Sequence, residues 1–150
     1  MSNMTFSSEA RWAGRGVGVE LTARQHRWYV DEPRALGGVD EGPNPVELLL
    51  GALGSCMTVL AALYAPEHGV ELRSFAVSLE GDLDPDGFQG KAPVRPGFQQ
   101  IRFDFHVESS SPPERVAALL EHIERVCPVR DTLTGVPVVL KRGLGAATTR

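Results

Sequence analysis

Residues 44–66 read NPVELLLGALGSCMTVLAALYAP, and this stretch decides the fold. It holds no charged residue after Glu47. Asn44 is a typical N-cap residue, Pro45 suits the first helical position, and Glu47 is favoured at the positive end of the helix dipole. The sequence therefore predicts a helix that runs from Pro45 to about Pro66.

The uncharged part of this helix is long enough to raise the question of a membrane span. Gly51, Gly54, Ser55 and Thr58 lower its hydrophobicity, and no cluster of basic residues flanks it. A helix that is apolar on all sides is normally buried inside a protein. We therefore expect a central core helix whose complete burial requires a partner subunit, and we expect no membrane partner.

The segments on either side of the helix alternate apolar and polar residues, as half-buried strands do. Before the helix, residues 5–31 are strand-like and lead into a loop rich in glycine and proline. After it, we expect strands at 71–82 and 101–107, an amphipathic helix whose start signal lies at 109–114 and which ends at Pro128, a last strand at 136–140, and a frayed tail at 143–150. The predicted fold class is α+β.

Length and composition narrow the classes of protein. The chain has 150 residues, which fits a single domain spanning residues 1–150. It is 42% hydrophobic and 23% charged, with a net charge of -4 and scattered basic residues, so we expect no nucleic-acid partner. The first residues, MSNMTFSSEARW, lack the basic start and apolar run of a signal peptide, which favours the cytoplasm, where thiols stay reduced.

The two cysteines are the candidate reactive groups. Cys56 lies in the middle of the uncharged helix, and Cys127 lies four residues beyond Ile123, on the apolar side of the second helix. Both are expected to point into the core, where they could meet. Free cysteine is also among the most buried residue types, so structural filler is the alternative for each. A working pair would need a cation or hydrogen-bond donors to stabilise a thiolate.

Several short motifs carry a resemblance to a known family. Residues 44–49, followed by Gly54-Ser55-Cys56, resemble the central-helix motif of the OsmC/Ohr family of hydroperoxide reductases. Residues 126–129 resemble its second motif, and residues 34–38 resemble the loop before its helix. The resemblance implies an intertwined homodimer in which antiparallel sheets wrap two long central helices. It also implies thiol-dependent reduction of organic hydroperoxides, with a dithiol as the reductant.

The resemblance also implies roles for particular residues. Cys56 would be the peroxidatic thiol, which attacks the peroxide, and Cys127 the resolving thiol. An arginine from the glycine-rich N-terminal segment would stabilise the thiolate, and Arg15 is the best match, ahead of Arg34 and Arg11. An arginine suits this task because it stays charged and can grip a carboxylate with two bonds. The alternative for Arg15 is a plain surface residue of a turn.

One position departs from the family pattern. The acid that holds the arginine follows the proline directly in the family, whereas this chain has Val46 there and its acid at Glu47. On a regular helix Val46 lies about 80° from Cys56 and Glu47 about 180° away. Glu47 is retained as a catalytic candidate, although helix capping is the interpretation that its position favours. The loop acids Glu32, Asp40 and Glu41 are possible substitutes.

The remaining polar residues indicate no cofactor. His26, His68, His106 and His122 form no cluster with the spacing of metal ligands, and His106 and His122 are expected on solvated surfaces. The glycines around Arg15 lack the strand–helix context of a dinucleotide-binding motif. We therefore expect neither a metal nor a cofactor.

Three functions remain open. The first is a two-cysteine peroxidase that reduces organic hydroperoxides through Cys56 and Cys127. The second is a binding module on the same fold, whose apolar dimer cleft holds a hydrophobic small molecule while the thiols are incidental. The absence of an acid at Val46 favours this second function. The third is a structural or regulatory dimer without a ligand.

Overall fold

The computed structural model describes residues 1–141, and the tail expected at 143–150 lies outside them. The chain packs as two compact units, of which the first is Met1–Leu49 and the second begins at Leu50. The long helix α1 (Pro45–Tyr64) starts in the first unit and continues through the second. The expectation of a single domain stays a prediction.

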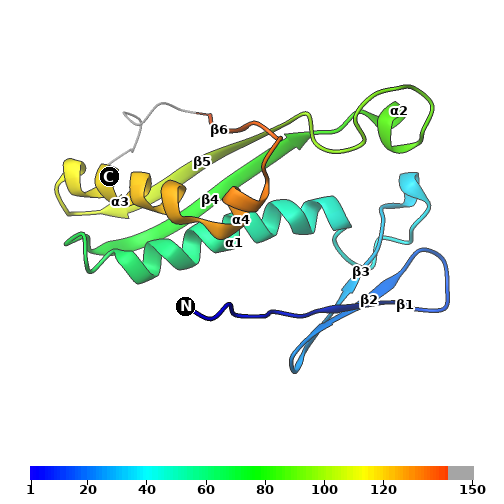
Figure 1. The fold of residues 1–150 in the computed structure, drawn as a ribbon, viewed down its shortest axis with the longest axis horizontal. Coiled ribbons are helices and arrows are strands. Elements are labelled where there is room, and N and C mark those ends of the chain that lie inside the picture. The colour runs from blue at the N-terminus through cyan, green and yellow to red at the C-terminus, as the bar shows by residue number, and fades with distance from the viewer. Residues whose placement is uncertain (142–150) are drawn as a thin grey trace. The chain divides into compact units, whose positions relative to one another are not determined.

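The first unit is built on a three-stranded antiparallel meander. Its strands, in the order β1-β2-β3, are β1 (Glu9–Trp12), β2 (Val19–Ala23) and β3 (His26–Val30) (Figure 1). The strand-like character expected for residues 5–31 is thus confirmed, and the segment forms three strands, of which β1 is fully exposed. After β3 the chain forms a loop that contains the short 3-10 helix η1 (Arg34–Leu36).

Helix α1 begins with a capping box, which confirms the predicted start. The Asn44 side-chain oxygen accepts a hydrogen bond from the backbone N–H of Glu47 at 2.9 Å. In return, the Glu47 carboxylate accepts one from the backbone N–H of Asn44 at 2.9 Å. This reciprocal pair satisfies two of the amides that every helix start leaves unpaired.

The second unit places helices against one face of a three-stranded sheet. Strand β4 (Leu72–Asp82) pairs antiparallel with β5 (Gln100–Ser109), and β6 (Val138–Leu140) pairs parallel with β5. The short helix α2 (Pro85–Phe88) lies in the loop between β4 and β5. The parallel β5–β6 pair differs from the antiparallel sheets we expected. Helices α3 (Pro113–Val126) and α4 (Pro128–Thr132) form the crossover that a parallel connection requires.

The core lies between this sheet and the helices α1 and α3, which run along the two long strands (Figure 1). Pro128 ends α3 as expected, but it also starts α4, an additional short helix that was not predicted. Residues with no exposed surface come from α1, β5 and α3; they are Leu53, Met57, Ala61, Ile101, Leu119 and Ile123. Cys127, which is 1% exposed, belongs to this core, and Cys56 packs against it.

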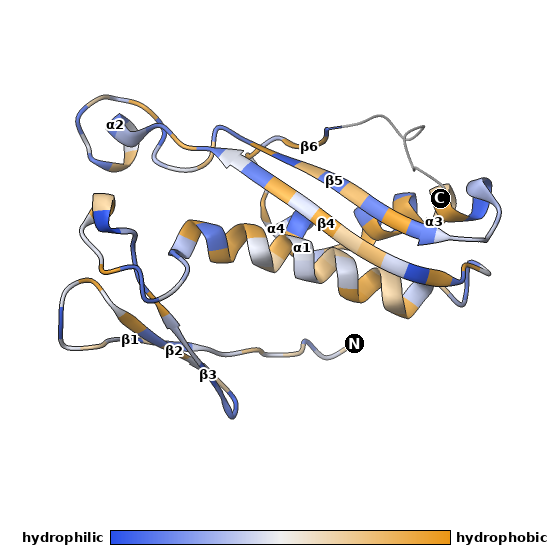
Figure 2. Cartoon of the chain, turned by 180° about the vertical axis from the view of Figure 1, so that it is seen from behind, coloured by the Kyte–Doolittle hydropathy of each residue, from blue (hydrophilic) through white to orange (hydrophobic). Residues whose placement is uncertain are grey.

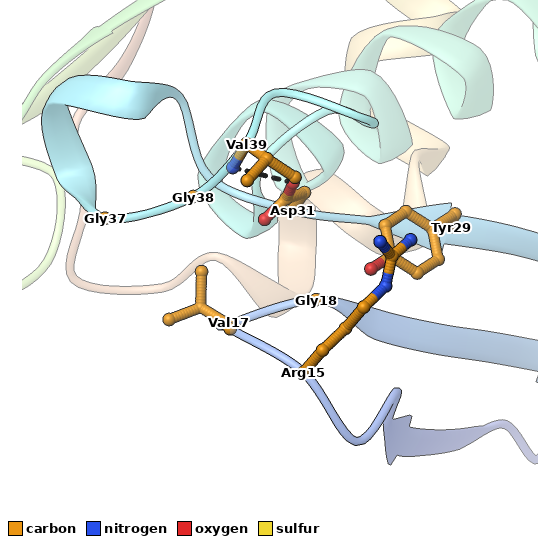
Figure 3. Close-up of a pocket in the computed structure, with 9 residues that line it drawn as sticks. Arg15, Val17, Gly18, Tyr29, Asp31, Gly37, Gly38 and Val39 are labelled. Atoms are coloured by element: carbon orange, nitrogen blue, oxygen red, sulfur yellow. Dashed lines mark hydrogen bonds between the residues drawn. The ribbon is translucent and has the colours of Figure 1, made fainter.

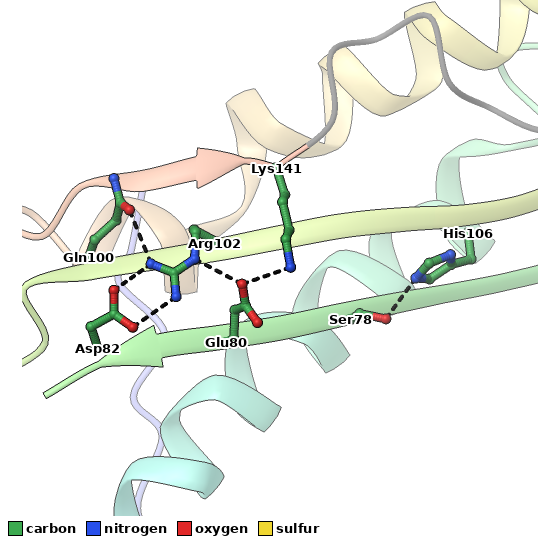
Figure 4. Close-up of polar contacts among 7 residues, drawn as sticks. All are labelled: Ser78, Glu80, Asp82, Gln100, Arg102, His106 and Lys141. Carbon is green, nitrogen blue, oxygen red and sulfur yellow. Dashed lines mark hydrogen bonds and ion pairs between the residues drawn. The ribbon is translucent and has the colours of Figure 1, made fainter.

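The other face of the sheet is polar. Arg102 pairs with Asp82 at 2.8 Å and with Glu80 at 2.9 Å, and Lys141 joins Glu80 at 2.9 Å (Figure 4). The hydrogen bond from Lys141, together with Arg102, holds the pKa of Glu80 below its usual range. Farther along the sheet, Ser78 and His106 share a hydrogen bond of 2.7 Å. This ion-paired face suits contact with water.

The apolar character of α1 extends over its whole surface. By length and composition, α1 is the one helix of residues 1–141 that could cross a membrane, a test that a soluble core helix also passes. Along its length apolar residues dominate, whereas β4 alternates polar and apolar residues (Figure 2). One side of α1 packs on the sheet, since a Cβ on Gly54 would lie 2.5 Å from Leu79. On the opposite side Val59 and Leu63 are exposed.

Candidate active site

The structure brings the two cysteines together. The Sγ atoms of Cys56, on α1, and Cys127, at the end of α3, lie 3.2 Å apart, and both are free thiols. Leu53 and Met57, which flank Cys56 on α1, are fully buried. Ile123, one turn before Cys127 on α3, is also fully buried. The buried side of α1 and the apolar stripe of α3 therefore turn both thiols into the same core, which confirms the predicted meeting.

The two thiols differ in access to solvent. Cys127 is only 1% exposed, whereas Cys56 is half-buried. A small oxidant that approaches from solvent meets Cys56 first. The pair is therefore asymmetric: Cys56 is accessible to an oxidant from solvent, and Cys127 is buried next to it.

Cys127 occupies the break between two helices. Its backbone is extended, with φ -70° and ψ 110°, and its sulfur caps α4 by accepting a hydrogen bond from the backbone N–H of Arg130 at 3.4 Å. Burial raises the pKa of the Cys127 thiol, while the Arg130 amide opposes that rise. The thiol thus holds its proton at neutral pH, next to a donor that can stabilise it once the proton leaves.

The guanidinium of Arg130 has a separate, structural task. It pairs with Glu124 at 2.9 Å, donates to the Val138 carbonyl oxygen at 3.3 Å, and lies 5.9 Å from the centre of the Phe103 ring. These contacts join α3, α4 and β6. Because this guanidinium is paired with Glu124, the positive charge of Arg130 is already neutralised.

Arg15, the cation expected at the site, lies in the first unit in the turn between Gly14 and Gly16. Its guanidinium pairs with the carboxylate of Glu41 at 2.8 Å. Arg15 also lines a pocket of about 100 Å³, together with Tyr29, Asp31 and the segment 37–39 (Figure 3). One of the three loop acids considered as substitutes for the missing acid, Glu41, is therefore the acid that contacts Arg15.

Asp31 organises the loop that carries Glu41, and it is not among the site residues predicted from the sequence. Asp31 is 2% exposed, and its carboxylate accepts hydrogen bonds from the backbone N–H groups of Glu32 at 2.8 Å, Val39 at 3.1 Å and Glu41 at 3.2 Å. These bonds, that from Glu32 foremost, hold the pKa of Asp31 below its usual value. An acid at the end of a strand, before a glycine-rich loop, is the signal that could have identified it.

Acid should open this loop. Because the folded pKa of Asp31 is depressed, its stabilising effect is present above its ordinary pKa of 3.8 and is lost as the pH falls through the lower folded value. We expect hydrogen exchange, corrected for intrinsic rates, to show the Val39 and Glu41 amides losing protection over that range.

The variant Asp31→Asn should weaken the protection of these amides already at pH 7. Asp40→Asn is the matched control, since Asp40 is exposed and asparagine tolerates its φ of 65°. Coinciding Asp31→Asn and wild-type profiles would contradict this role.

The other predicted site residues lie elsewhere. Glu47 is exposed, and its carboxylate serves the capping box, so its capping role is confirmed while a role in catalysis stays a prediction. Arg11 pairs with Glu9 at 2.7 Å, and Arg34 is exposed in η1. Val46 is 36% exposed at the first turn of α1.

One expectation about the histidines was wrong. His122 is half-buried rather than solvated, because its Nδ1 lies 3.0 Å from Nε2 of His68 and its ring stacks 4.4 Å from that of Tyr64. The turn after α1 brings His68 to this position, which sequence spacing cannot show. His106 is exposed, as expected. Within residues 1–141, no group of three or more His, Cys, Asp or Glu side chains is placed to hold a metal ion.

Comparison with known proteins agrees with this architecture. The model of the OsmC-like protein family matches residues 38–141. An OsmC-like protein from Mycoplasma pneumoniae has the same fold, with a TM-score of 0.77 at 17% identity over 93% of this chain and 97% of that chain. An OsmC-like protein of unknown function from Vibrio cholerae gives 0.78 at 12% identity over 93% and 99%. An organic hydroperoxide resistance protein, OsmC, from Legionella pneumophila gives 0.65 at 23% identity over 93% and 97%. No curated protein sequence matches significantly.

Proposed function

Because this chain belongs to the OsmC-like protein family, we propose that it is a thiol-dependent peroxidase that reduces organic hydroperoxides through Cys56 and Cys127. The observation that carries the proposal is the pair of free thiols 3.2 Å apart, one half-buried and one fully buried. A similar fold in an organic hydroperoxide resistance protein from Legionella pneumophila supports the choice of substrate class.

The first step is nucleophilic attack by the Cys56 thiolate on the terminal oxygen of the hydroperoxide. The O–O bond breaks, and its electron pair leaves with the alkoxide, which takes up a proton and departs as the alcohol. Sulfur supplies the two electrons and becomes a sulfenic acid. Cys56 is the thiol assigned to this step because it is the more accessible of the two.

The second step closes a disulfide. Cys127 loses its proton and attacks the Cys56 sulfur, the S–O bond breaks, and the hydroxide leaves as water after protonation. The backbone N–H of Arg130 supports the developing thiolate of Cys127, since it already donates to that sulfur at 3.4 Å. A dithiol from the cell then reduces the disulfide by two exchange steps and restores both thiols.

Arg15 is assigned to stabilise the Cys56 thiolate. A reactive cysteine needs a nearby positive charge to remain ionised at neutral pH. Arg15 suits this role because it is always charged and has several donors to spare after its one contact with Glu41. The assignment follows the family resemblance of its glycine-flanked turn.

The active form is proposed to be a cytoplasmic homodimer. The side of α1 away from its sheet carries Val59 and Leu63, which are 56% and 63% exposed. Exposed apolar residues that gather on one helix face are typical of a surface that binds another protein. A Cβ on Gly51 would meet no atom of this chain within 4 Å, so the helix surface at Gly51 is open to a partner.

Charge on this helix face should break the dimer. We expect wild-type protein to sediment as a dimer at micromolar concentration, and the double variant Val59→Asp/Leu63→Asp to sediment as a monomer, because each aspartate would be buried unpaired. Val139→Asp is the control, since Val139 is 37% exposed on β6. A wild-type monomer under these conditions would overturn the dimer proposal.

Steady-state turnover tests the proposed activity. Cumene hydroperoxide should be consumed with dithiothreitol as the reductant, and one alcohol should form for each dithiol oxidised. If neither the peroxide nor the dithiol is consumed faster than in the uncatalysed reaction, the peroxidase assignment is wrong.

A binding module is the second candidate function, and Val46 favours it. With valine at the position where the family has its acid, the arginine lacks that partner. In that case a hydrophobic small molecule would occupy the apolar dimer cleft, and the thiols would play no part. Native mass spectrometry should then detect a copurified ligand, and peroxide should form no bond between Cys56 and Cys127.

A further inference from the structure

Arg15 has an acidic partner that the family pattern does not supply. We infer that Glu41 is the positioning residue for Arg15, in place of the acid missing at Val46, and that buried Asp31 fixes the loop from which Glu41 reaches it. The inference rests on the proposed function, in which Arg15 stabilises the Cys56 thiolate. Glu41 acts through Arg15 and has no assigned contact with the substrate or the reacting sulfur.

The contact between Glu41 and Arg15 is direct. Nη2 of Arg15 lies 2.8 Å from Oε2 of Glu41, within the range of a charge-assisted hydrogen bond. A guanidinium has five N–H donors in a planar fork, so one contact with Glu41 leaves the others free for a thiolate or a peroxide oxygen. Glu41 can therefore orient the arginine without occupying it.

The backbone of Glu41 is fixed close to its carboxylate. Its N–H donates to Oδ2 of Asp31 at 3.2 Å, and Val39, two residues earlier, donates to the same oxygen at 3.1 Å. The N–H of Asp40 donates to the carbonyl oxygen of Glu32 at 3.1 Å. Three successive hydrogen bonds thus tie residues 39–41 to Asp31 and Glu32, which directly follow β3.

Two glycines let this loop lie against the strand. A Cβ on Gly38 would lie 1.8 Å from the carbonyl oxygen of Glu32, and one on Gly42 would lie 2.4 Å from that of Tyr29. No side chain fits at either position without moving backbone atoms. The segment that carries Glu41 is therefore held close to the strand at Gly38 and at Gly42, which restricts the positions that the Glu41 carboxylate can take.

The exposure of both side chains indicates that this ion pair orients Arg15 more than it stabilises the fold. The side chains of Arg15 and Glu41 are 69% and 46% exposed, and exposed pairs add little to folding free energy. The first unit offers a matched pair without a proposed task. Arg27 and Glu20 lie 3.9 Å apart with exposures of 72% and 45%. Glu20 is therefore the control against which any effect at Glu41 is judged.

The test compares Glu41→Gln, Glu41→Asp, Glu20→Gln and Arg15→Gln. Misplacing a catalytic group by about 1 Å can cost up to about 100-fold in rate, so Glu41→Gln should lower kcat/KM for cumene hydroperoxide by about 10- to 100-fold. Glu41→Asp keeps the charge and should recover part of that loss, while Glu20→Gln should match wild type. Adding Glu41→Gln to Arg15→Gln should cause no further loss, because the two residues act as one unit.

A second readout does not depend on peroxide. The rate of Cys56 alkylation by iodoacetamide, followed by peptide mass spectrometry against pH, reports its thiolate. Glu41→Gln should move this profile to higher pH, as Arg15→Gln does, while both variants keep the wild-type melting temperature.

The outcomes separate the inference from the proposed function. If Glu41→Gln matches wild type in both readouts while Arg15→Gln is impaired, the inference about Glu41 is wrong and the peroxidase stands. If wild type consumes no peroxide, the proposed function fails, and the alkylation profiles still decide whether Glu41 acts on Cys56 through Arg15.

Discussion

Replacing Cys56 by serine is expected to reduce the turnover of organic hydroperoxides at least about 1000-fold, as loss of a nucleophile typically does. A serine hydroxyl is not ionised at neutral pH and cannot take oxygen from a peroxide as sulfur does. The measurement is steady-state consumption of cumene hydroperoxide with dithiothreitol. The side chain changes by one atom, so the packing around Leu53 and Met57 should survive.

The neighbouring residue supplies the control. Ser55 is exposed, and its hydroxyl donates only to the carbonyl oxygen of Ala52 at 3.1 Å. Ser55→Ala should therefore keep the wild-type rate. Turnover by Cys56→Ser at the wild-type rate would show that the peroxidatic assignment is wrong.

Replacing Cys127 by serine should separate the two chemical steps. The first turnover needs only Cys56, so a single-turnover burst should remain within about threefold of wild type, a range of less than 1 kcal/mol in barrier. Steady-state turnover should fall by about 100-fold or more, because the sulfenic acid then has no resolving thiol. Stopped-flow measurement of the burst and of the following steady state gives both rates.

The chemical state of Cys56 distinguishes this result from simple misfolding. In Cys127→Ser the excess peroxide should carry Cys56 on to sulfinic acid, which peptide mass spectrometry detects as two added oxygens. In wild type the same treatment should leave Cys56 in a disulfide. A Cys127→Ser variant with an unchanged steady state, and no sulfinic acid, would contradict the resolving role.

Much of the fold follows from local sequence patterns. The uncharged run after Glu47 fixed the long helix, and the Asn44 capping signal placed its start at the observed residue. Alternation along the second unit predicted β4 and β5, whose helix-facing residues are apolar. Because both helices have one clearly buried side, the meeting of Cys56 and Cys127 could also be predicted.

Other features depend on contacts between distant segments. Val138–Leu140 is too short to reveal its parallel pairing with β5, which the crossover through α3 and α4 imposes. Likewise, the pairing of Arg15 with Glu41 joins residues 26 positions apart. This pairing depends on how the loop folds around Asp31, and no periodic pattern in the sequence predicts that Asp31 is buried. The same is true of His122, which only the turn after α1 brings against His68.

The most direct test of the account is the state of the two thiols after one equivalent of organic hydroperoxide. Reduced wild-type protein should lose both thiols, and intact mass should fall by two hydrogens. Peptide mapping without reduction should then identify one Cys56–Cys127 disulfide, which dithiothreitol reverses. If both thiols remain after peroxide is added, or if Cys56 is oxidised with no bond to Cys127, the two-cysteine peroxidase is contradicted.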